Sequence, residues 1–382
     1  MRIVIVGAGV IGLLTAVHCA RAGHEVALYE QDEIPSPRGT SFDRHRVLRT
    51  LQPGDQAATK AAMRAHRQWI ELQNLLSAEF YERVGALTVL PGRSLSQSWT
   101  MLDRAGSRAR VLTPADLRSR YPQFRFPAEA GAVLEPHVGV LLADRVLTAG
   151  AAWLRLHSRA ELHPRRRVAG VDAQATTLWL EDGESVRADA ILLAAGPRSR
   201  ELLAPEISGQ LVLHRQSMLY CEVPPDEAAP WSTTPAISSF GVEHGAWLVP
   251  PVADTPLKLS SNSACRVVAG LDGPATPLIW RDHLLEVFSE VLPGLGEDWL
   301  FGTRDCYFLG HGAAGGALVV ELARSVFCFA ACGGGSFKFA PLIARSLTER
   351  LTGFEPAPTG LRPVDRAVPA AARDPRPPRI VM

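Results

Sequence analysis

The residues of this chain best suited to chemistry are its few lysines. Only three of the 40 basic residues are lysines, Lys60, Lys258 and Lys338, and the others are arginines. An ammonium group is a compact point charge that can exchange a proton, which the guanidinium group of arginine does not do. The lysines are therefore candidates for work that arginine cannot perform. The ordinary alternatives are a snorkelling surface residue for Lys258 and a helix-start residue for Lys338.

A glycine-rich turn at the start of the chain is a second candidate site. Gly7, Gly9 and Gly12 have the spacing GxGxxG between a strand-like segment (residues 3–6) and a helical one that runs to about Arg21. A second strand-like segment ends in Glu30, eighteen residues after Gly12. This pattern predicts a βαβ unit that binds an adenine dinucleotide, with pyrophosphate at the helix N-terminus and Glu30 accepting hydrogen bonds from a ribose. The motif does not separate FAD from NAD.

A second match to the same spacing occurs at Gly310, Gly312 and Gly315. A strand-like segment rather than a helix follows it, so we interpret it as a hairpin loop. The sequence then has one dinucleotide site and lacks a second, nicotinamide-binding domain. Electrons that reach the cofactor must leave by another route, most simply to oxygen.

Composition narrows the possible partners. The net charge is +1 over 382 residues, which gives no electrostatic reason to expect nucleic acid or an anionic membrane as a partner. Residues 316–335 are apolar but include Glu321 and Arg324, so we expect no membrane span there. Six cysteines without CxxC pairs indicate a reducing compartment and no metal site. The chain enters its first strand without a signal peptide, and we expect a cytoplasmic protein.

Periodicity predicts the elements between these motifs. Helices are expected at residues 56–80, 144–157, 281–292 and 342–351, and another should begin at Thr113 as N-cap with Pro114 at its first position. Strands are expected around residues 84–90, 132–142, 168–193, 211–261, 303–309 and 318–329. Residues 354–382 are rich in Pro, Ala and Arg and are expected to form a loosely ordered tail.

Three segments together resemble the FAD-dependent amine oxidases of the D-amino acid oxidase superfamily, most closely the monomeric sarcosine oxidase group. They are GAGVIGLLTAVHCARAGHEVALYE, AILLAAGPRSRELL and GGGSFKFAP, and the resemblance extends to about Gly353. It implies an α/β fold with a discontinuous Rossmann-like FAD-binding domain and a mixed-sheet substrate domain. The expected FAD domain comprises residues 1–80, 143–210 and 301–353, and the substrate domain residues 81–142 and 211–300.

The resemblance also implies roles for individual residues. In the motif Arg46-Val47-Leu48-Arg49, the first arginine should lie near the flavin and the second should bind a substrate carboxylate together with Lys338. Lys258 matches the lysine that activates oxygen over the flavin, where a fixed positive charge would stabilise negative charge developing on oxygen. Lys258, Arg49, Lys338 and Arg46 are thus the expected catalytic residues. The expected cofactor contacts are Gly7, Gly9, Gly12, Glu30, Thr40, Val168, Gly196, Cys306, Gly334, Gly335, Phe337 and Lys338.

Cys306 matches the cysteine that the sarcosine oxidase group links covalently to the flavin. The alternative is a small buried hydrophobe, the usual fate of a lone cysteine. The sequence after it is Tyr-Phe-Leu-Gly-His, where the family often has a Thr-Pro-Asp-like turn, so the neighbouring loop is expected to differ in shape.

Other departures concern the substrate pocket. Trp247 replaces a family tyrosine, Asn262 replaces a family histidine, and Phe42-Asp43-Arg44-His45 replaces smaller residues before the arginine motif. The pocket is therefore not expected to be tuned for sarcosine. Trp247 either packs against a larger or cyclic substrate or belongs to the core. His45 and His311 are expected to be structural or solvent-facing rather than catalytic.

These features predict an oxidase that converts the C–N bond of an amino or imino acid to an imine, with secondary or cyclic amines favoured. Its partners would be that small molecule and molecular oxygen, and a monomer is expected. One alternative is an FAD monooxygenase, which should carry a Gly-Asp motif where this chain has Ala331-Cys332-Gly333. Another is an FAD dehydrogenase with a non-oxygen acceptor, or a flavin-binding protein without turnover.

Overall fold

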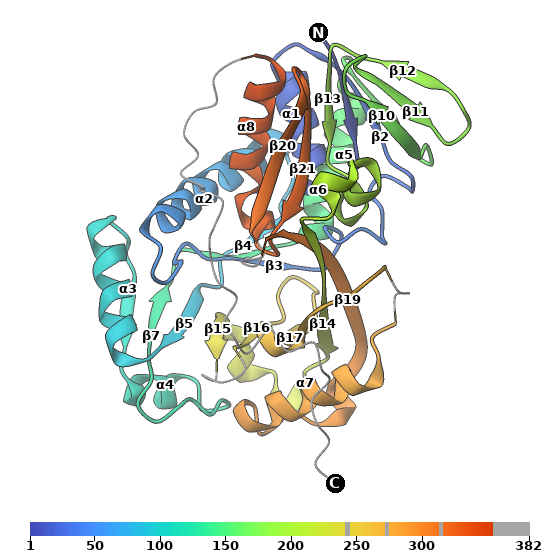
Figure 1. Cartoon of the computed structure of the whole chain (residues 1–382). Helices are drawn as coiled ribbons and strands as arrows, with labels where there is room; N and C mark the ends of the chain where they lie inside the picture. The colour runs from blue at the N-terminus through green and yellow to red at the C-terminus, as the bar shows by residue number, and fades with distance from the viewer. Residues whose placement is uncertain (241–244, 272–274, 313–315, 354–382) are drawn as a thin grey trace.

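The computed structural model describes residues 1–240, 245–271, 275–312 and 316–353. The described chain forms two lobes, one around the N-terminal strands and one around a large mixed sheet (Figure 1). The expected tail at residues 354–382 and Gly315 of the second glycine motif lie outside the described residues.

A six-stranded sheet forms the centre of the first lobe, in the order β20-β21-β13-β1-β2-β9. The pairs β21–β13, β13–β1, β1–β2 and β2–β9 are parallel, and β20 pairs antiparallel with β21 at the edge. The bounds are β1 Arg2–Val6, β2 Glu25–Tyr29, β9 Ala160–His163, β13 Ala190–Leu193, β20 Ala317–Ala323 and β21 Val326–Cys332.

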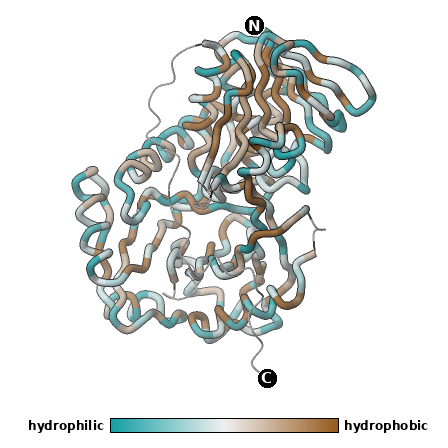
Figure 2. Tube along the Cα trace, in the orientation of Figure 1, coloured by the Kyte–Doolittle hydropathy of each residue, from teal (hydrophilic) through white to brown (hydrophobic). Residues whose placement is uncertain are grey.

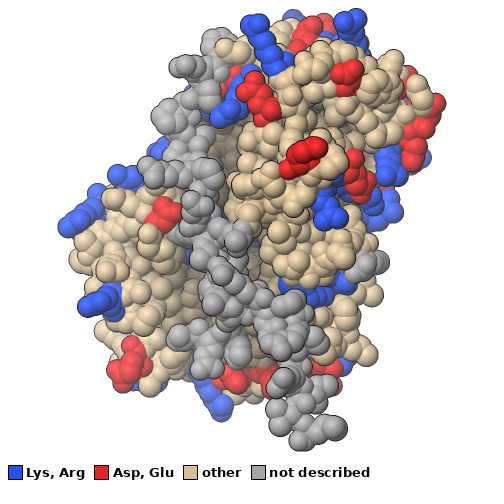
Figure 3. Space-filling view, in the orientation of Figure 1, with Lys and Arg blue, Asp and Glu red and all other residues tan. Residues whose placement is uncertain are grey.

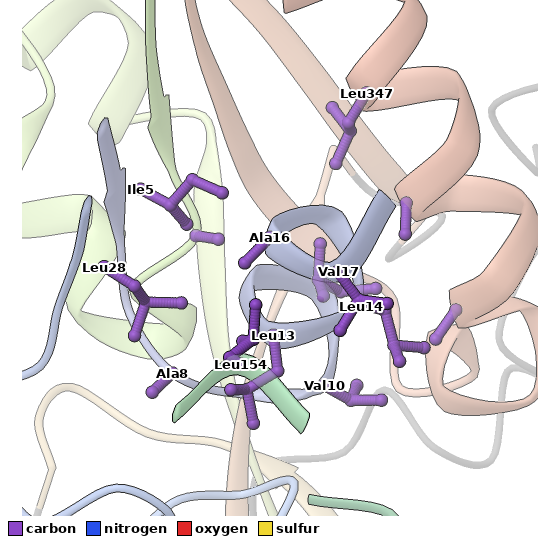
Figure 4. Close-up of a cluster of buried hydrophobic side chains, with 14 of the residues drawn as sticks. Ile5, Ala8, Val10, Leu13, Leu14, Ala16, Val17, Leu28, Leu154 and Leu347 are labelled. Carbon is purple, nitrogen blue, oxygen red and sulfur yellow. The ribbon is translucent and has the colours of Figure 1, made fainter. Parts of the chain in front are cut away.

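Both faces of this sheet are covered, which explains the continuous apolar runs of its strands (Figure 2). On one face lie α1 (Val10–Arg21), α2 (Gln56–Leu76), α5 (Ala143–Leu156) and α8 (Ala340–Leu351). Figure 4 shows α1 between the sheet and α8, with Ile5 and Leu28 on one side and Leu347 on the other. The other face packs against an antiparallel ribbon of β10 (Val168–Asp172), β11 (Thr177–Leu180) and β12 (Ser185–Arg187).

The second lobe is built on a sheet in the order β18-β14-β17-β16-β15-β5-β7-β6, with β19 paired to β14. Helices α4 (Pro114–Arg120) and α7 (Leu278–Val291) share its apolar core, and α3 (Gly92–Arg104) packs beside β5 and β7. The strand bounds are β5 Ala86–Leu90, β6 Arg110–Leu112, β7 Gly131–Glu135, β14 Leu211–Cys221, β15 Ala236–Phe240, β16 Ala246–Val249, β17 Leu257–Ser261, β18 Cys265–Val267 and β19 Leu300–His311.

Strands β14 and β19 belong to both lobes (Figure 1). They pair antiparallel along their whole length, from Leu211 opposite His311 to Cys221 opposite Leu300. At one end, Leu211 and Leu309 join the core of the first lobe, and at the other end Cys221 joins the core of the second. The proposed division into an FAD domain and a substrate domain stays a prediction, and β19 lies against both sheets.

A small sheet lies at the junction of the lobes (Figure 1). Its order is β3 (Arg46–Leu48), β8 (Gly139–Leu141) and β4 (Tyr81–Glu82). Short 3₁₀ helices complete the described chain, including η1 (Gly196–Leu202) and η6 (Ser336–Phe339), with a helical turn α6 at Pro205–Ser208. None of the helices in the described ranges is long and apolar enough to cross a membrane. Figure 3 shows basic and acidic side chains interspersed on the visible face.

The expected fold class is confirmed, and so are the expected helices, to within a few residues at their ends. Thr113 caps α4 by accepting a hydrogen bond from the Asp116 N–H, while the Asp116 carboxylate accepts one from the Thr113 N–H. The helix expected to reach Phe80 ends at Leu76, because Ser77 adopts a left-handed conformation (φ 49°). Helix α3 was not predicted, since it buries only Ser98 and Leu102 and has no side-chain cap.

Candidate active site

One continuous cavity of about 2280 Å³ runs between the lobes. It is lined by all but one of the residues expected at the cofactor and substrate sites. Those lining it are Gly7, Gly9, Glu30, Thr40, Arg46, Arg49, Val168, Gly196, Lys258, Cys306, Gly334, Gly335, Phe337 and Lys338. The exception is Gly12, which lies behind the glycine turn rather than on the cavity wall.

The glycine turn at the first end of the cavity depends on close backbone contacts. Gly7 has φ +101°, and a Cβ there would lie 2.4 Å from the carbonyl oxygen of Ala194. A Cβ on Gly12 would lie 1.9 Å from the carbonyl oxygen of Gly7, so α1 approaches the turn more closely than any side chain allows. The Val10 N–H donates to the Ser41 hydroxyl oxygen at 3.1 Å. The helix N-terminus thus faces the cavity with small residues around it.

Glu30 is tied to the same turn. Its Oε2 accepts a hydrogen bond from the Ala8 N–H at 2.8 Å, and its Oε1 accepts one from the Asp32 N–H at 3.2 Å. Burial raises the pKa of this carboxyl, and the two backbone donors oppose that rise. A carboxylate held at the end of β2 beside a glycine turn is the arrangement that a ribose of a dinucleotide requires.

A buried cluster of charged groups lies at the other end of the cavity. Lys258 on β17 donates a hydrogen bond to Asp43 Oδ2, and Arg46 Nη1 lies 2.9 Å from the same oxygen. The side chains of Lys258 and Asp43 are only 1% and 2% exposed, so the surface alternative for Lys258 is wrong. Arg46 Nη2 also donates to the carbonyl oxygen of Thr40 at 2.7 Å.

The charges in this cluster shift one another's pKa values. Burial alone would raise the pKa of Asp43, but Lys258 and Arg46 outweigh it and hold that pKa well below its usual range. Burial lowers the pKa of Lys258 to about 8, with Asp43 opposing and Arg46 reinforcing the decrease. The lysine is therefore the member of the cluster that titrates nearest to neutral pH.

Aromatic and imidazole rings surround the ammonium group. Lys258 Nζ lies 5.7 Å from the ring centroid of Trp247 and 5.8 Å from that of Tyr220. These three side chains share one face of the mixed sheet, since Tyr220 pairs with Lys258, and Trp247 pairs with Ser260 two residues further on. His45 is fully buried nearby, and burial, with Lys258, lowers its pKa to about 3. His45 was expected to be structural or solvent-facing rather than catalytic, and of these two alternatives its burial is consistent with the structural one.

A buried carboxylate orders the segment that follows Arg49. Arg49 Nη1 donates to the carbonyl oxygen of Leu51 at 2.7 Å. Glu135, at the end of β7, accepts hydrogen bonds from the N–H groups of Thr50 and Leu51, each at 3.1 Å, and from the Thr50 hydroxyl. Burial raises the pKa of Glu135, while these donors and the charge of Arg49 oppose that rise.

Lys338 lies in the short helix η6, immediately before α8. Its carbonyl oxygen accepts a hydrogen bond from Trp69 Nε1 at 2.9 Å, and the indole stacks on Phe337 with centroids 5.8 Å apart. The backbone of the glycine-rich loop is thereby fixed to α2. Lys338 Nζ lies 5.6 Å from the ring centroid of Phe339.

Cys306 projects from β19 on the cavity side of the mixed sheet. It lies opposite Gln216 of β14, and Cys265 of β18 lies opposite the same glutamine on the other side. Burial raises the pKa of the Cys306 thiol, while Arg46 and Lys258 oppose that rise. Cys306 is a free thiol in this structure, as are Cys265 and Cys332 on the same cavity wall.

Sequence reasoning missed three residues that organise the site: Asp43, Tyr220 and Glu135. Asp43 belongs to a segment that departs from the family, but nothing in the sequence pairs it with Lys258, which is 215 residues away. Trp247 and Asn262 do line the cavity, as their family positions suggested.

The residues along the cavity fit FAD. The first end offers a glycine turn, a helix N-terminus and a ribose-type carboxylate, as a dinucleotide requires. Near the middle, Gly334 has φ +71° and packs against Phe308, where a Cβ would lie 3.0 Å from the ring. FAD would thus extend from the glycine turn toward the cluster of Lys258, Arg46 and Asp43.

Comparison with known proteins agrees with this geometry. The family described as FAD dependent oxidoreductase (DAO) matches residues 2–350. Mouse peroxisomal sarcosine oxidase is 28% identical over 214 residues, 53% of this chain and 52% of the relative. Glycine oxidase of Pseudomonas aeruginosa is 30% identical over 252 residues, 56% of this chain and 62% of the relative. The aligned part of this chain thus spans little more than half the length of these curated relatives.

Two solved structures share the fold over nearly the whole chain. A modified fructosyl peptide oxidase from Aspergillus nidulans superposes with a TM-score of 0.80 at 19% identity, covering 98% of this chain and 96% of that one. L-proline dehydrogenase from P. horikoshii gives a TM-score of 0.78 at 16% identity, covering 92% and 93%. With the family match across residues 2–350, the chain belongs to the DAO family of FAD-dependent oxidoreductases.

Proposed function

We propose that this protein oxidises the C–N bond of an amino or imino acid to an imine and passes the electrons to molecular oxygen. The observation that carries the proposal is the continuous cavity, which joins the dinucleotide turn to Arg49, Lys338 and Lys258. When bound, FAD accepts two electrons from the substrate and passes them to oxygen, which yields hydrogen peroxide.

In this proposal Arg49 and Lys338 hold the substrate carboxylate. A guanidinium group can grip a carboxylate with two parallel hydrogen bonds, and an ammonium group adds a point charge. Both residues line the cavity, and Glu135 fixes the backbone beside Arg49. The amine would bind in its neutral form, so no dedicated side-chain base is required.

Lys258 has the role of favouring the reaction with oxygen. A buried ammonium group that is already in place stabilises negative charge on oxygen without reorganisation. Trp247 and Met218 both line the cavity, and their apolar side chains suit a substrate with an apolar group next to the amine. This supports secondary or cyclic amines as substrates rather than glycine.

The resemblance of Cys306 to the flavin-linking cysteine of the sarcosine oxidase group supports a covalent flavin. Cys306 lines the cavity, and the nearby positive charges of Arg46 and Lys258 oppose the rise in its thiol pKa that burial causes. Acid precipitation tests this part alone. Flavin colour should stay in the wild-type pellet and move to the supernatant in Cys306→Ala, with Cys265→Ala as the matched control. Wild-type colour in the supernatant would exclude the link and leave FAD binding intact.

The second candidate is a dehydrogenase that uses an acceptor other than oxygen. The TM-score with L-proline dehydrogenase is 0.78, close to the 0.80 with the fructosyl peptide oxidase, and this similarity supports the dehydrogenase as a candidate. In either case we propose a cytoplasmic monomer. Light scattering on the purified protein would test the monomeric state.

The deciding experiment mixes FAD-loaded enzyme anaerobically with sarcosine, glycine, L-proline, D-proline and pipecolate. Flavin bleaching identifies a substrate, and admission of oxygen should restore the colour with one peroxide per turnover. The amide of the best substrate lacks the carboxylate that Arg49 would hold. The wild type should therefore oxidise this amide slowly, and Arg49→Met should lower that rate little further. Bleaching without reoxidation by oxygen, but with reoxidation by a dye, would favour the dehydrogenase.

A further inference from the structure

Asp43 is a buried carboxylate whose oxygens are all engaged. Oδ1 accepts hydrogen bonds from the Arg44 N–H at 2.7 Å and from the Tyr220 hydroxyl at 2.5 Å. Oδ2 accepts one from Lys258 and lies 2.9 Å from Arg46 Nη1. Four donors around one buried carboxylate hold it ionised and fix its orientation.

The charges facing Lys258 are few. Asp43 provides the negative charge, and Arg46 provides a second positive charge on the same carboxylate oxygen. The other titratable groups that face it are Tyr220 on β14, Cys306 on β19 and His45 beside β3. Burial raises the pKa of Tyr220 and of Cys306 and lowers that of His45, so each is neutral near pH 7. Among the described residues around the ammonium group, Asp43 is thus the anion.

Burial and Arg46 both oppose the charged form of Lys258, and Asp43 favours it. Arginine stays protonated in proteins, so the lysine gives up its proton if the balance changes. The hydrogen bond to Asp43, with a longer one of 3.4 Å to the carbonyl oxygen of His45, also holds the ammonium group between Tyr220 and Trp247.

We propose that Asp43 is a positioning residue that keeps Lys258 protonated and holds its ammonium group at the cavity wall. The proposal rests on the role given to Lys258 in the function proposed above. It adds that the oxygen reaction depends on a buried acidic residue that does not itself line the cavity.

Direct titration of Lys258 tests the proposal without relying on activity. The chain has only three lysines, so holoenzyme carrying ¹³Cε-lysine gives three side-chain signals. Loss of a signal in Lys258→Met assigns it, and exposed Lys60 serves as the internal reference. In the wild type we expect Lys258 to titrate near pH 8, as its lowered pKa of about 8 indicates.

Asp43→Asn should lower the Lys258 midpoint by at least about one pH unit, a tenfold loss of proton affinity. Tyr220→Phe keeps both charges and the ring, so its shift should be much smaller. Arg46→Met removes the competing cation and should raise the midpoint, which keeps the test decisive if Asp43→Asn does not fold. An unmoved midpoint in Asp43→Asn, or a lowered one in Arg46→Met, would overturn the proposal.

The rate of flavin reoxidation by oxygen separates this inference from the proposed function. In the wild type the rate should fall as pH rises through the Lys258 midpoint, and in Asp43→Asn the fall should begin at a correspondingly lower pH. If the midpoint moves and the reoxidation profile does not, Asp43 positions Lys258 as proposed but the oxygen role of Lys258 is wrong.

Discussion

At the scale of single residues, the scarcity of lysine was the most informative feature of the sequence. It singled out Lys258 and Lys338, and both residues line the cavity. The partners of Lys258 could not be predicted from the sequence. Asp43 lies 215 residues from Lys258 and 177 residues from Tyr220, so the three meet only in the folded chain. Residue types indicated the chemistry, and the fold determined which ionised groups share a buried site.

Replacing Lys258 with methionine tests its role directly. Met is similar in length but carries no charge and no donor, so we expect flavin reoxidation by oxygen to slow by about 10²–10³-fold, as when one preorganised hydrogen-bond donor is removed from an oxyanion site. Anaerobic reduction by substrate should change much less. Stopped-flow measurement of the two half-reactions gives both rates, and Lys60→Met on the exposed side of α2 is the matched control. Equal slowing of both half-reactions would argue against a specific role in the oxygen step.

At the scale of elements, local patterns were predicted and long-range ones were not. The βαβ start and helix α4 were predicted because their turn and cap residues lie within a few positions of one another. Helix α3 was missed because its polar, weakly buried sequence carries no such signal. The hydrogen bonds that Glu135 accepts from residues 50–51 join segments 84–85 residues apart, and no local pattern in the sequence encodes them.

Gly12→Ala should disturb the packing of α1 on the glycine turn. The added Cβ would lie 1.9 Å from the Gly7 carbonyl oxygen, which forces the helix away from the turn. Overpacking of this kind costs about 1–3 kcal/mol of unfolding free energy. Urea unfolding and FAD titration should show lower stability and weaker binding. Gly92→Ala, with open space around the Cβ at the start of α3, should leave both nearly unchanged.

Glu135→Gln should weaken substrate binding through the backbone beside Arg49. The amide keeps the shape but loses the charge and one acceptor, and hydrogen bonds to a charged group contribute about 1.5–3 kcal/mol each. We expect KM for carboxylate substrates to rise more than kcat falls. Steady-state kinetics checks this, with exposed Glu129→Gln as the control. A fall in kcat at constant KM would place the effect on the chemical step instead.

At the scale of the whole molecule, two histidines make the fold sensitive to acid, the half-buried His18 and the buried His45. Burial lowers the pKa of His18 to about 4 and that of His45 to about 3, from 6.5. Below pH 6.5 the unfolded chain takes up protons at these sites while the folded chain does not, so stability is full above pH 6.5 and declines below it. Asp43, with its lowered pKa, adds to the loss only below its unfolded value of 3.8.

The unfolding free energy should therefore fall between pH 6.5 and 4 by up to about 1.4 kcal/mol per pH unit for each histidine. Urea unfolding at several pH values measures this slope. His18 lies on α1 beside α2 and α8 and does not line the cavity, so His18→Gln should make the slope shallower. A flat profile across this range would contradict the burial assigned to both rings.

The continuous pairing of β14 and β19 has a further consequence for how the cavity opens. Both strands are embedded in the cores of both lobes. The lobes therefore cannot separate as rigid bodies without breaking backbone hydrogen bonds between β14 and β19. Entry to the cavity then relies on movements of side chains and loops at its mouth. We therefore expect the enzyme to select amines by size at the entrance of the cavity rather than by closure of the lobes around them.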